Sequence, residues 1–309
     1  MTESDKQNLD TKGLFQDKID LVDLYNTLWK EKKLIIAITS LVAIGSVIFS
    51  ISLTNYYTSE SSLISRSSQD SGGLLSEYSG LASLAGVGLP GSKESDIVEV
   101  MEIIESRDFV KHLITFEGVL PSIMAAESYD ISSQELYFDP DIYDEATKTW
   151  TREPQNNNKI IPSYLEAHEE YLGIMSLSKD QTTGLVSMSI EHKSPFFAKE
   201  LLELIIKEVN NLRREDDIEE ADMALRYLKE ELSRTPQVAI KGSINELIKN
   251  QLETRIMAKV NEEYSLIIVE PPFVPEKKSK PNRGLICILS TLIAGVLSSL
   301  FVLVRRSIA

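Results

Sequence analysis

Residues 34–53 read LIIAITSLVAIGSVIFSISL, a run of 20 residues without a charge. As a helix rising about 1.5 Å per residue, this run is about 30 Å long, the thickness of a bilayer's hydrocarbon core. Residues 285–304, LICILSTLIAGVLSSLFVLV, form a second uncharged run of 20 residues. Helices buried in globular proteins rarely run so long without a polar stripe. Both runs are therefore predicted to span a membrane, and the 33 residues before the first indicate an uncleaved anchor rather than a signal peptide.

Basic residues flank the two predicted spans on the sides nearest the chain ends. They are Lys30, Lys32 and Lys33 before the first span, and Arg305 and Arg306 after the second. Two spans return the chain to its starting side, so both clusters share one face, which the positive-inside rule predicts to be cytoplasmic. Further basic residues just before the second span lie on the other side, where a long translocated domain weakens the rule. The predicted parts are a cytoplasmic tail (1–33), the first span (34–53), an extracytoplasmic domain (54–284), the second span (285–304) and a cytoplasmic tail (305–309).

Charge is concentrated in the domain between the spans. The chain has 47 acidic and 32 basic residues among 309, a net charge of -15, and residues 54–284 contain 40 of the acidic and 24 of the basic residues. This excess argues against nucleic acid as a partner. One cysteine and three histidines exclude a disulfide framework and argue against a thiolate or histidine-rich metal centre. The mean hydropathy of -0.10 conceals two apolar spans around one acidic domain.

Small residues recur at every fourth position of the second span. One row is Ser290, Ala294 and Ser298, and the next is Thr291, Gly295 and Ser299. Such rows let helix backbones approach closely in lipid, within one protomer or between protomers. Ser46 and Ser50 of the first span could face them.

The domain between the spans is predicted to be α+β. Its strands are placed at 57–65, 173–179, 184–192 and 265–269, and its helices at 93–116, 163–172, 195–235 and 238–264. The order strand, helix, strand, strand, helix, strand predicts a ferredoxin-like layout with a very long helical extension over about 195–264. Residues 118–163 are predicted to be irregular. The Ser/Gly-rich stretch 66–92 is predicted to be a loop or a short, weakly formed helix.

The long helix has clear start and stop signals. Ser194 is a candidate N-cap with Pro195 at the first helical position, and Pro236 interrupts the helix. The charged run 213–217 separates two apolar rows, as if the helix left one packing surface for another. These rows, predicted to pack in the protomer or against its neighbours, comprise Leu202, Ile205, Val209, Leu212, Ile218, Leu225, Leu228 and Leu232.

Sequence motifs for catalysis or cofactor binding are weak throughout the chain. Residues 86–91, GVGLPG, match G-x-G-x-x-G, but they do not follow a strand within a βαβ unit. His168 and Glu169 begin an H-E-x-x-H pattern that Leu172 breaks. We therefore predict no catalytic, cofactor-binding or metal-binding residues, and no enzyme activity.

Four segments together resemble one family, the polysaccharide co-polymerases of the Wzz type. They are residues 19–29 (IDLVDLYNTLW), residues 80–86 with 105–109, the hairpin-to-helix junction 183–195, and the proline-rich set Pro271, Pro272, Pro275, Pro281 and Arg283. With two terminal spans and a long helix, the resemblance covers nearly the whole chain.

The resemblance implies a homo-oligomeric ring in the bacterial inner membrane with its main domain in the periplasm. Such a ring would control the modal length of a lipid-linked polysaccharide, such as the O-antigen of lipopolysaccharide, that a separate membrane-embedded polymerase makes. The family carries no catalytic residues. The short tail 305–309 leads us to expect a larger, stand-alone member without a kinase domain.

Three other functions agree with parts of the sequence. A membrane-anchored periplasmic adaptor or scaffold of a polysaccharide export machine is the main alternative. A two-span sensory receptor needs a cytoplasmic signalling module, and only residues 305–309 follow the second span. An extracytoplasmic enzyme lacks a site constellation.

Overall fold

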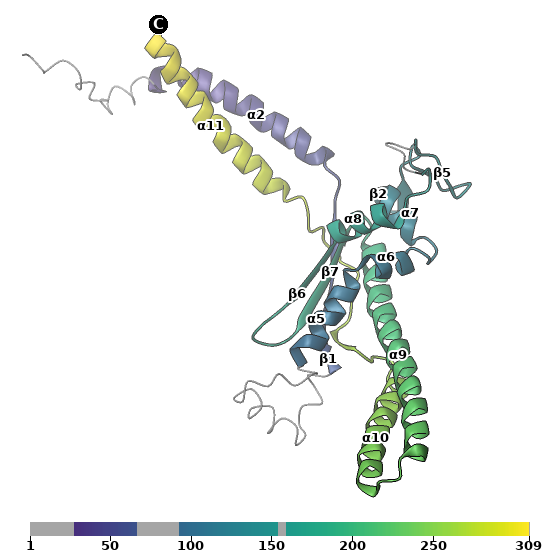
Figure 1. The fold of residues 1–309 in the computed structure, drawn as a ribbon. Helices are drawn as coiled ribbons and strands as arrows, with labels where there is room; N and C mark the ends of the chain where they lie inside the picture. Colours follow the sequence, from purple (N-terminus) through teal and green to yellow (C-terminus); the bar gives the residue numbers. More distant parts are fainter. Residues whose placement is uncertain (1–27, 67–92, 154–158, 309) are drawn as a thin grey trace, which may run out of the picture. The chain divides into compact units, whose positions relative to one another are not determined.

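A computed structural model of the chain describes residues 28–66, 93–153 and 159–308 (Figure 1). Its contacts divide into two units, which are described separately here. One contains residues 1–53 and 281–309, and the other runs from Thr54 to Lys280. The stretch predicted to be a loop or weak helix, 66–92, lies outside the described residues except for Arg66.

The first unit is a pair of long apolar helices. Helix α2 spans Lys32–Ser52 and helix α11 spans Arg283–Ile308. Both are long and apolar enough to cross a membrane, which is compatible with a membrane protein. The helices contain nearly all of the two uncharged runs and extend beyond them into charged residues at Lys32, Arg283 and Arg305.

The second unit is built on a four-stranded antiparallel sheet in the order β6-β7-β1-β8. The strands are β1 (Tyr57–Ser65), β6 (Met175–Lys179), β7 (Val186–His192) and β8 (Leu266–Glu270). These four strands lie within one or two residues of the predicted ranges, so the domain mixes helices and strands as expected.

One face of this sheet carries the hydrophobic core. Side chains alternate between faces along a strand, so the buried Val186, Met188 and Ile190 of β7 point to the same side. Helices α8 (Tyr164–Ile174) and α9 (Pro195–Arg234) cover that side, and both contact β7. Leu63 of β1 joins the same cluster. The opposite face is polar, with Ser176, Ser189 and Glu60 in one cross-strand row and Ser178, Ser187 and Ser62 in the next.

Two of the predicted helical boundaries are wrong by a few residues because side-chain caps decide them. The predicted helix 93–116 is split into α5 (Lys93–Ile104) and α6 (Arg107–Leu113), since the Ser106 side chain accepts a hydrogen bond from the Phe109 amide and starts a new helix. A capping box between Ser163 and Glu166 starts α8, which continues to Ile174 and delays β6 until Met175.

The prediction of irregular structure over 118–163 is wrong for nearly half of its described residues. It contains α7 (Val119–Ala125) and two small hairpins, formed by β2 (Ala126–Asp130) with β3 (Glu135–Phe138) and by β4 (Tyr143–Asp144) with β5 (Thr149–Trp150). Asp130 and Asp144 accept backbone hydrogen bonds two residues on, which turns the chain. The strands are too short for alternation to reveal them.

The long helical extension consists of two helices, as the predicted break at Pro236 requires. Helix α9 has 40 residues, about 60 Å of helix. Helix α10 (Val238–Val260) follows the break at Pro236. It packs against α9, and the two helices form a hairpin (Figure 1). Helix α10 ends four residues before the predicted Tyr264, since Asn261 adopts an extended backbone there. Ser194 and Pro195 start α9 as predicted.

Candidate functional surfaces

The proline-rich segment follows the edge strand β8 and is held to β1 by serine side chains. Pro271 and Pro272 lack backbone N–H groups, so they cannot continue the ladder beyond Glu270. Instead, the hydroxyl of Ser61 donates to the carbonyl oxygen of Glu270 at 2.7 Å, and that of Ser59 donates to the carbonyl oxygen of Phe273 at 2.8 Å. Both serines are buried. Serine hydroxyls thus provide donors along a segment whose own backbone has few.

The predicted proline-rich residues do not form one cluster. Pro272 and Pro275 are buried in the sheet domain, whereas Pro271 is exposed. Closer to the C-terminal end of the segment, the Ser279 amide donates to the Tyr56 carbonyl oxygen at 2.8 Å.

The last two members of the proline-rich set belong to the helix-pair unit. Pro281 is half-buried, and Arg283 begins α11. Its Nη2 lies 3.4 Å from the carbonyl oxygens of both Ile51 and Leu53, at the end of α2. A guanidinium is a suitable donor for the carbonyls left unpaired at a helix C-terminus.

The first half of α9 is part of the domain core. Leu202, Ile205 and Val209 are fully buried, and Leu212 packs partly against the same cluster. This half of α9 also carries two buried polar side chains, Glu208 and Asn210. Glu208 Oε2 lies 2.8 Å from His112 Nε2 on α6.

Asn210 joins α9 to the start of β8 through four hydrogen bonds. Its Oδ1 accepts from the amides of Ser265 at 2.7 Å and Leu266 at 2.9 Å, and its Nδ2 donates to the carbonyl oxygens of Leu266 and Ile206 at 3.0 Å each. The side chain is 3% exposed. Sequence reasoning missed this residue, although an Asn within an apolar helical row was a usable signal.

The charged run 213–217 marks the place where α9 leaves the core. Arg213 Nη1 pairs with Glu99 Oε1 of α5 at 2.8 Å. The hydroxyl of Tyr264 donates to Asp217, and burial, together with this carboxylate, raises the pKa of Tyr264 above its usual value. The run therefore ties α9 to α5 and to the approach to β8.

Beyond this run, the second half of α9 packs on α10. Leu225 and Ala221 are buried there, as are Ile244 and Ala258 of α10. The predicted residues Ile218, Leu228 and Leu232 are half-buried. Many apolar side chains of the hairpin remain exposed, including Met223, Tyr227, Leu247, Ile256 and Val260.

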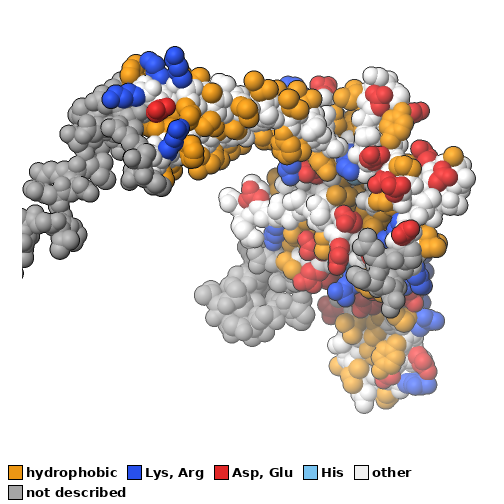
Figure 2. All heavy atoms as spheres, turned by 90° about the horizontal axis from the view of Figure 1, so that it is seen from above, with side chains coloured by type: hydrophobic (Ala, Val, Ile, Leu, Met, Phe, Trp, Pro, Cys, Tyr) orange, Lys and Arg blue, Asp and Glu red, His pale blue; other side chains and the backbone are white. Residues whose placement is uncertain are grey.

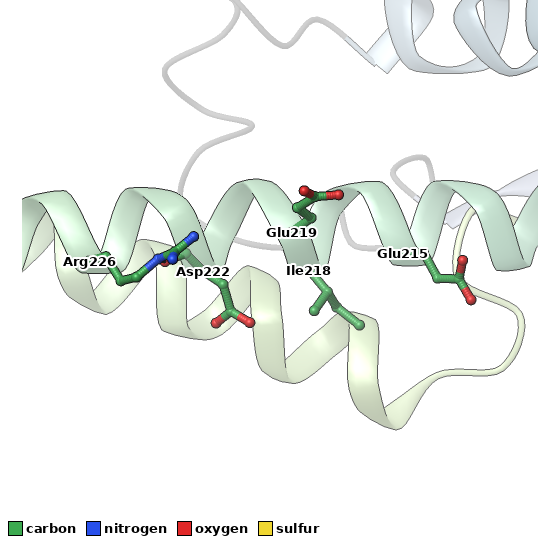
Figure 3. A pocket seen from close by; sticks show the side chains of 5 residues that line it. All are labelled: Glu215, Ile218, Glu219, Asp222 and Arg226. Atoms are coloured by element: carbon green, nitrogen blue, oxygen red, sulfur yellow. The ribbon is translucent and has the colours of Figure 1, made fainter.

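A hollow of about 590 Å³ lies on α9 (Figure 3). Its lining residues are Glu215, Ile218, Glu219, Asp222 and Arg226. All five come from α9, so one helix supplies every lining residue that the structure describes. Asp222 is already paired with Arg255 of α10, whose Nε lies 2.9 Å from its Oδ1. We regard it as an acidic surface of the hairpin.

The small residues of α11 lie on the side that packs against α2. Ala294 and Ser298 are buried, while Ser290, Thr291, Gly295 and Ser299 are half-buried. A Cβ atom at Gly295 would lie 3.8 Å from Cγ2 of Thr39 on α2. Ser46 and Ser50 of α2 are also buried, in a helix whose other side chains are mostly exposed. Ala294 and Ser298 of one row are thus buried in the helix-pair unit, and Gly295 of the other row lies beside α2.

The three histidines hold backbone or carboxylate partners. His168 Nε2 donates to the Glu105 carbonyl oxygen at 2.8 Å. His192 is buried, with Nε2 donating to the Ser122 carbonyl oxygen at 2.9 Å and Nδ1 accepting from the Ser194 amide at 3.1 Å. Burial lowers the pKa of His192 to about 4. In the described parts of the chain, no group of three or more metal-ligating side chains comes together. The G-x-G-x-x-G match at 86–91 lies outside those parts.

Residues 17–116 match the family model of Wzz, chain length determinant protein, which confirms the predicted resemblance. A comparison with curated proteins finds no match. Among solved structures, a full-length bacterial polysaccharide co-polymerase is similar over 94% of this chain and 98% of its own, with 16% identity and a TM-score of 0.38. A fragment of WzzB, a polysaccharide co-polymerase from Salmonella Typhimurium, is similar over 73% of this chain and 100% of its own, with 14% identity and a TM-score of 0.28.

Proposed function

We propose that this chain, which carries the Wzz chain length determinant domain over residues 17–116, regulates the modal length of a lipid-linked surface polysaccharide such as O-antigen. It does so without catalysing a reaction, as a homo-oligomeric ring beside a separate membrane-embedded polymerase. The family match is the observation that carries this proposal.

The proposed topology is a two-pass protein of the bacterial inner membrane. The tails 1–33 and 305–309 lie in the cytoplasm, 34–53 and 285–304 are the spans, and 54–284 is periplasmic. Support comes from the two apolar helices and from the basic residues beside them. The ferredoxin-like assignment of the periplasmic domain belongs to the same proposal, and the antiparallel order β6-β7-β1-β8 supports it.

The surfaces described above have proposed roles in the assembly. The rows of small residues in α11 hold α2 and α11 together, and the proline-rich segment links β8 to α11. The α9–α10 hairpin provides contacts between neighbouring protomers, because its exposed apolar side chains, such as Tyr227 at 67% and Val260 at 74%, need a partner in a stable assembly.

Complementation tests the function. The full chain is expressed in a bacterium that lacks its own length regulator, and its lipopolysaccharide is separated on a gel. A restored modal band is the expected result, and a random ladder at normal expression contradicts the proposal. Loss of surface glycan without a change in its length distribution, on deletion from the source bacterium, would favour the export adaptor. A monomeric mass in detergent would exclude the ring.

A further inference from the structure

Basic side chains at the junction of α2 and α11 already have protein partners. Arg283 contacts the carbonyl oxygens at the end of α2, as described above. In the sheet domain just before α11, Lys280 Nζ pairs with Glu191 Oε1 at 2.9 Å and Lys278 Nζ donates to Asn55 Oδ1 at 3.3 Å. These charges, which oppose the positive-inside pattern in the sequence, are therefore partly satisfied within the protein.

At the other end of the helix pair, the basic side chains are exposed to solvent. Lys30, Lys33 and Arg305 are exposed, and their side chains make no hydrogen bond or ion pair with any of the residues that the structure describes. Lys32 Nζ lies 4.3 Å from the centre of the Trp29 ring, itself 58% exposed. Glu31 is the only acidic residue in 28–53, and 283–309 contain none.

The packing of the two helices brings these residues to one end. Thr39 lies beside Gly295, and Ile51 lies beside Arg283, so α2 and α11 run antiparallel. The start of α2 and the end of α11 therefore meet. Figure 2 shows Lys and Arg side chains gathered at one end of the apolar surface of this helix pair. We call Lys30, Lys32, Lys33 and Arg305 the basic end.

We propose that the basic end binds the phosphate-containing headgroups of anionic phospholipids. Apolar helices lead directly into it, so its side chains stand at headgroup depth when the helices span a bilayer. Trp29 is of the type that occupies this interfacial layer. Clusters of four or more Lys and Arg beside a span attract anionic lipid. Glu31 is the one acidic residue among residues 28–53 and 283–309, so the basic side chains outnumber the acidic ones there. The proposal rests on the two-span topology proposed above.

Native mass spectrometry of the full chain in detergent tests this binding. The protein is titrated with phosphatidylglycerol or with phosphatidylcholine of the same acyl chains, and the retained lipids are counted. We expect about tenfold stronger retention of phosphatidylglycerol. The variant Lys30→Gln/Lys33→Gln/Arg305→Gln should lose this preference, because it removes three of the basic side chains that attract an anionic headgroup. Exposed side chains are replaced, so circular dichroism should be unchanged.

A matched control removes the same number of charges elsewhere. Lys229→Gln/Lys241→Gln/Lys259→Gln alters three exposed side chains of the α9–α10 hairpin and should keep the lipid preference. Excess inorganic phosphate should not displace the lipid, and displacement would instead assign a free-phosphate site. Equal retention of both lipids, or an unchanged preference in the triple variant, overturns the proposal. The proposal is also overturned if the triple variant retains lipid as before but no longer co-purifies with another membrane protein, because the basic end would then bind protein.

The topology on which the proposal rests is tested separately by carbonate extraction of membranes. Release of the chain into the supernatant contradicts the two-span topology itself. A chain that stays in the membrane pellet but shows no lipid preference contradicts only the lipid proposal.

Discussion

Replacement of Asn210 by alanine should destabilise the sheet domain more than most single substitutions. The change removes the side chain that satisfies the amides of Ser265 and Leu266 and the carbonyl oxygen of Leu266. Leu266 is fully buried, so water cannot easily replace the lost partner. The carbonyl oxygen of Ile206 keeps its bond within α9.

The magnitude follows from these three groups. A buried polar group left without a partner costs about 1–3 kcal/mol. Because Ser265 is only half-buried, we expect a total of about 4 kcal/mol in the free energy of unfolding. For a domain of this size, each kcal/mol lowers the melting temperature by about 2–4 °C, so the shift should be about 8–16 °C.

Thermal unfolding of the full chain in detergent, followed by near-ultraviolet circular dichroism, measures this shift. Asn211→Ala is the matched control. The Asn211 side chain donates to Glu208 at 3.1 Å and accepts from Arg214 at 2.9 Å, but it is only half-buried, so water can replace these partners and the loss should be about 1 kcal/mol. Asn210→Asp keeps both acceptor bonds and should fall between the two. A loss below about 1 kcal/mol for Asn210→Ala would show that β8 does not depend on this amide.

Three further predictions concern a buried histidine, the helix pair and the proline-rich segment. His192 has a lowered pKa of about 4 in the folded state against 6.5 unfolded, so the unfolded chain takes up the proton first as the pH falls. Stability should fall by roughly 3 kcal/mol between pH 6.5 and 4, and His192→Gln should show a shallower pH dependence of melting. Gly295→Ala should be tolerated, whereas Gly295→Leu should overpack the α2–α11 contact and cost about 1–3 kcal/mol in detergent unfolding; equal effects would contradict the close approach. Ser59→Ala and Ser61→Ala should each cost about 1 kcal/mol in denaturant unfolding, while the exposed Ser187→Ala should change stability by less than about 0.5 kcal/mol.

Strong local signals made much of the fold predictable. The uncharged runs mark α2 and α11, and Ser194 with Pro195 marks the start of α9. Strand β1 was predicted with its observed bounds, and its residues alternate between buried and less buried positions. The hairpins within 118–163 could not be predicted in this way, since two-residue strands such as Tyr143–Asp144 have no periodicity. Their stability comes from contacts such as that between the Tyr143 and Trp150 rings, 5.1 Å apart.

The candidate surfaces were only partly accessible to sequence reasoning. The apolar rows of α9 could be recognised, but not which part of each row is covered. Leu202 is buried in the core and Leu228 only half-buried on α10, although both sit in similar patterns. The roles of Ser59 and Ser61 were hidden for the same reason, because their acceptors lie more than 200 residues away in the chain.

The sequence alone determined what is set by hydropathy and local chemistry. A helix of twenty uncharged, mostly apolar residues is stable only in lipid or in a large hydrophobic core. A proline lacks a backbone N–H donor wherever it stands. Tertiary structure decided the pairings. It places the small residues of α11 against α2, joins Asn210 to β8, and leaves Lys30, Lys33 and Arg305 without protein partners among the described residues, while Lys280 has one. Such choices depend on distances between residues far apart in the chain, which no local pattern encodes.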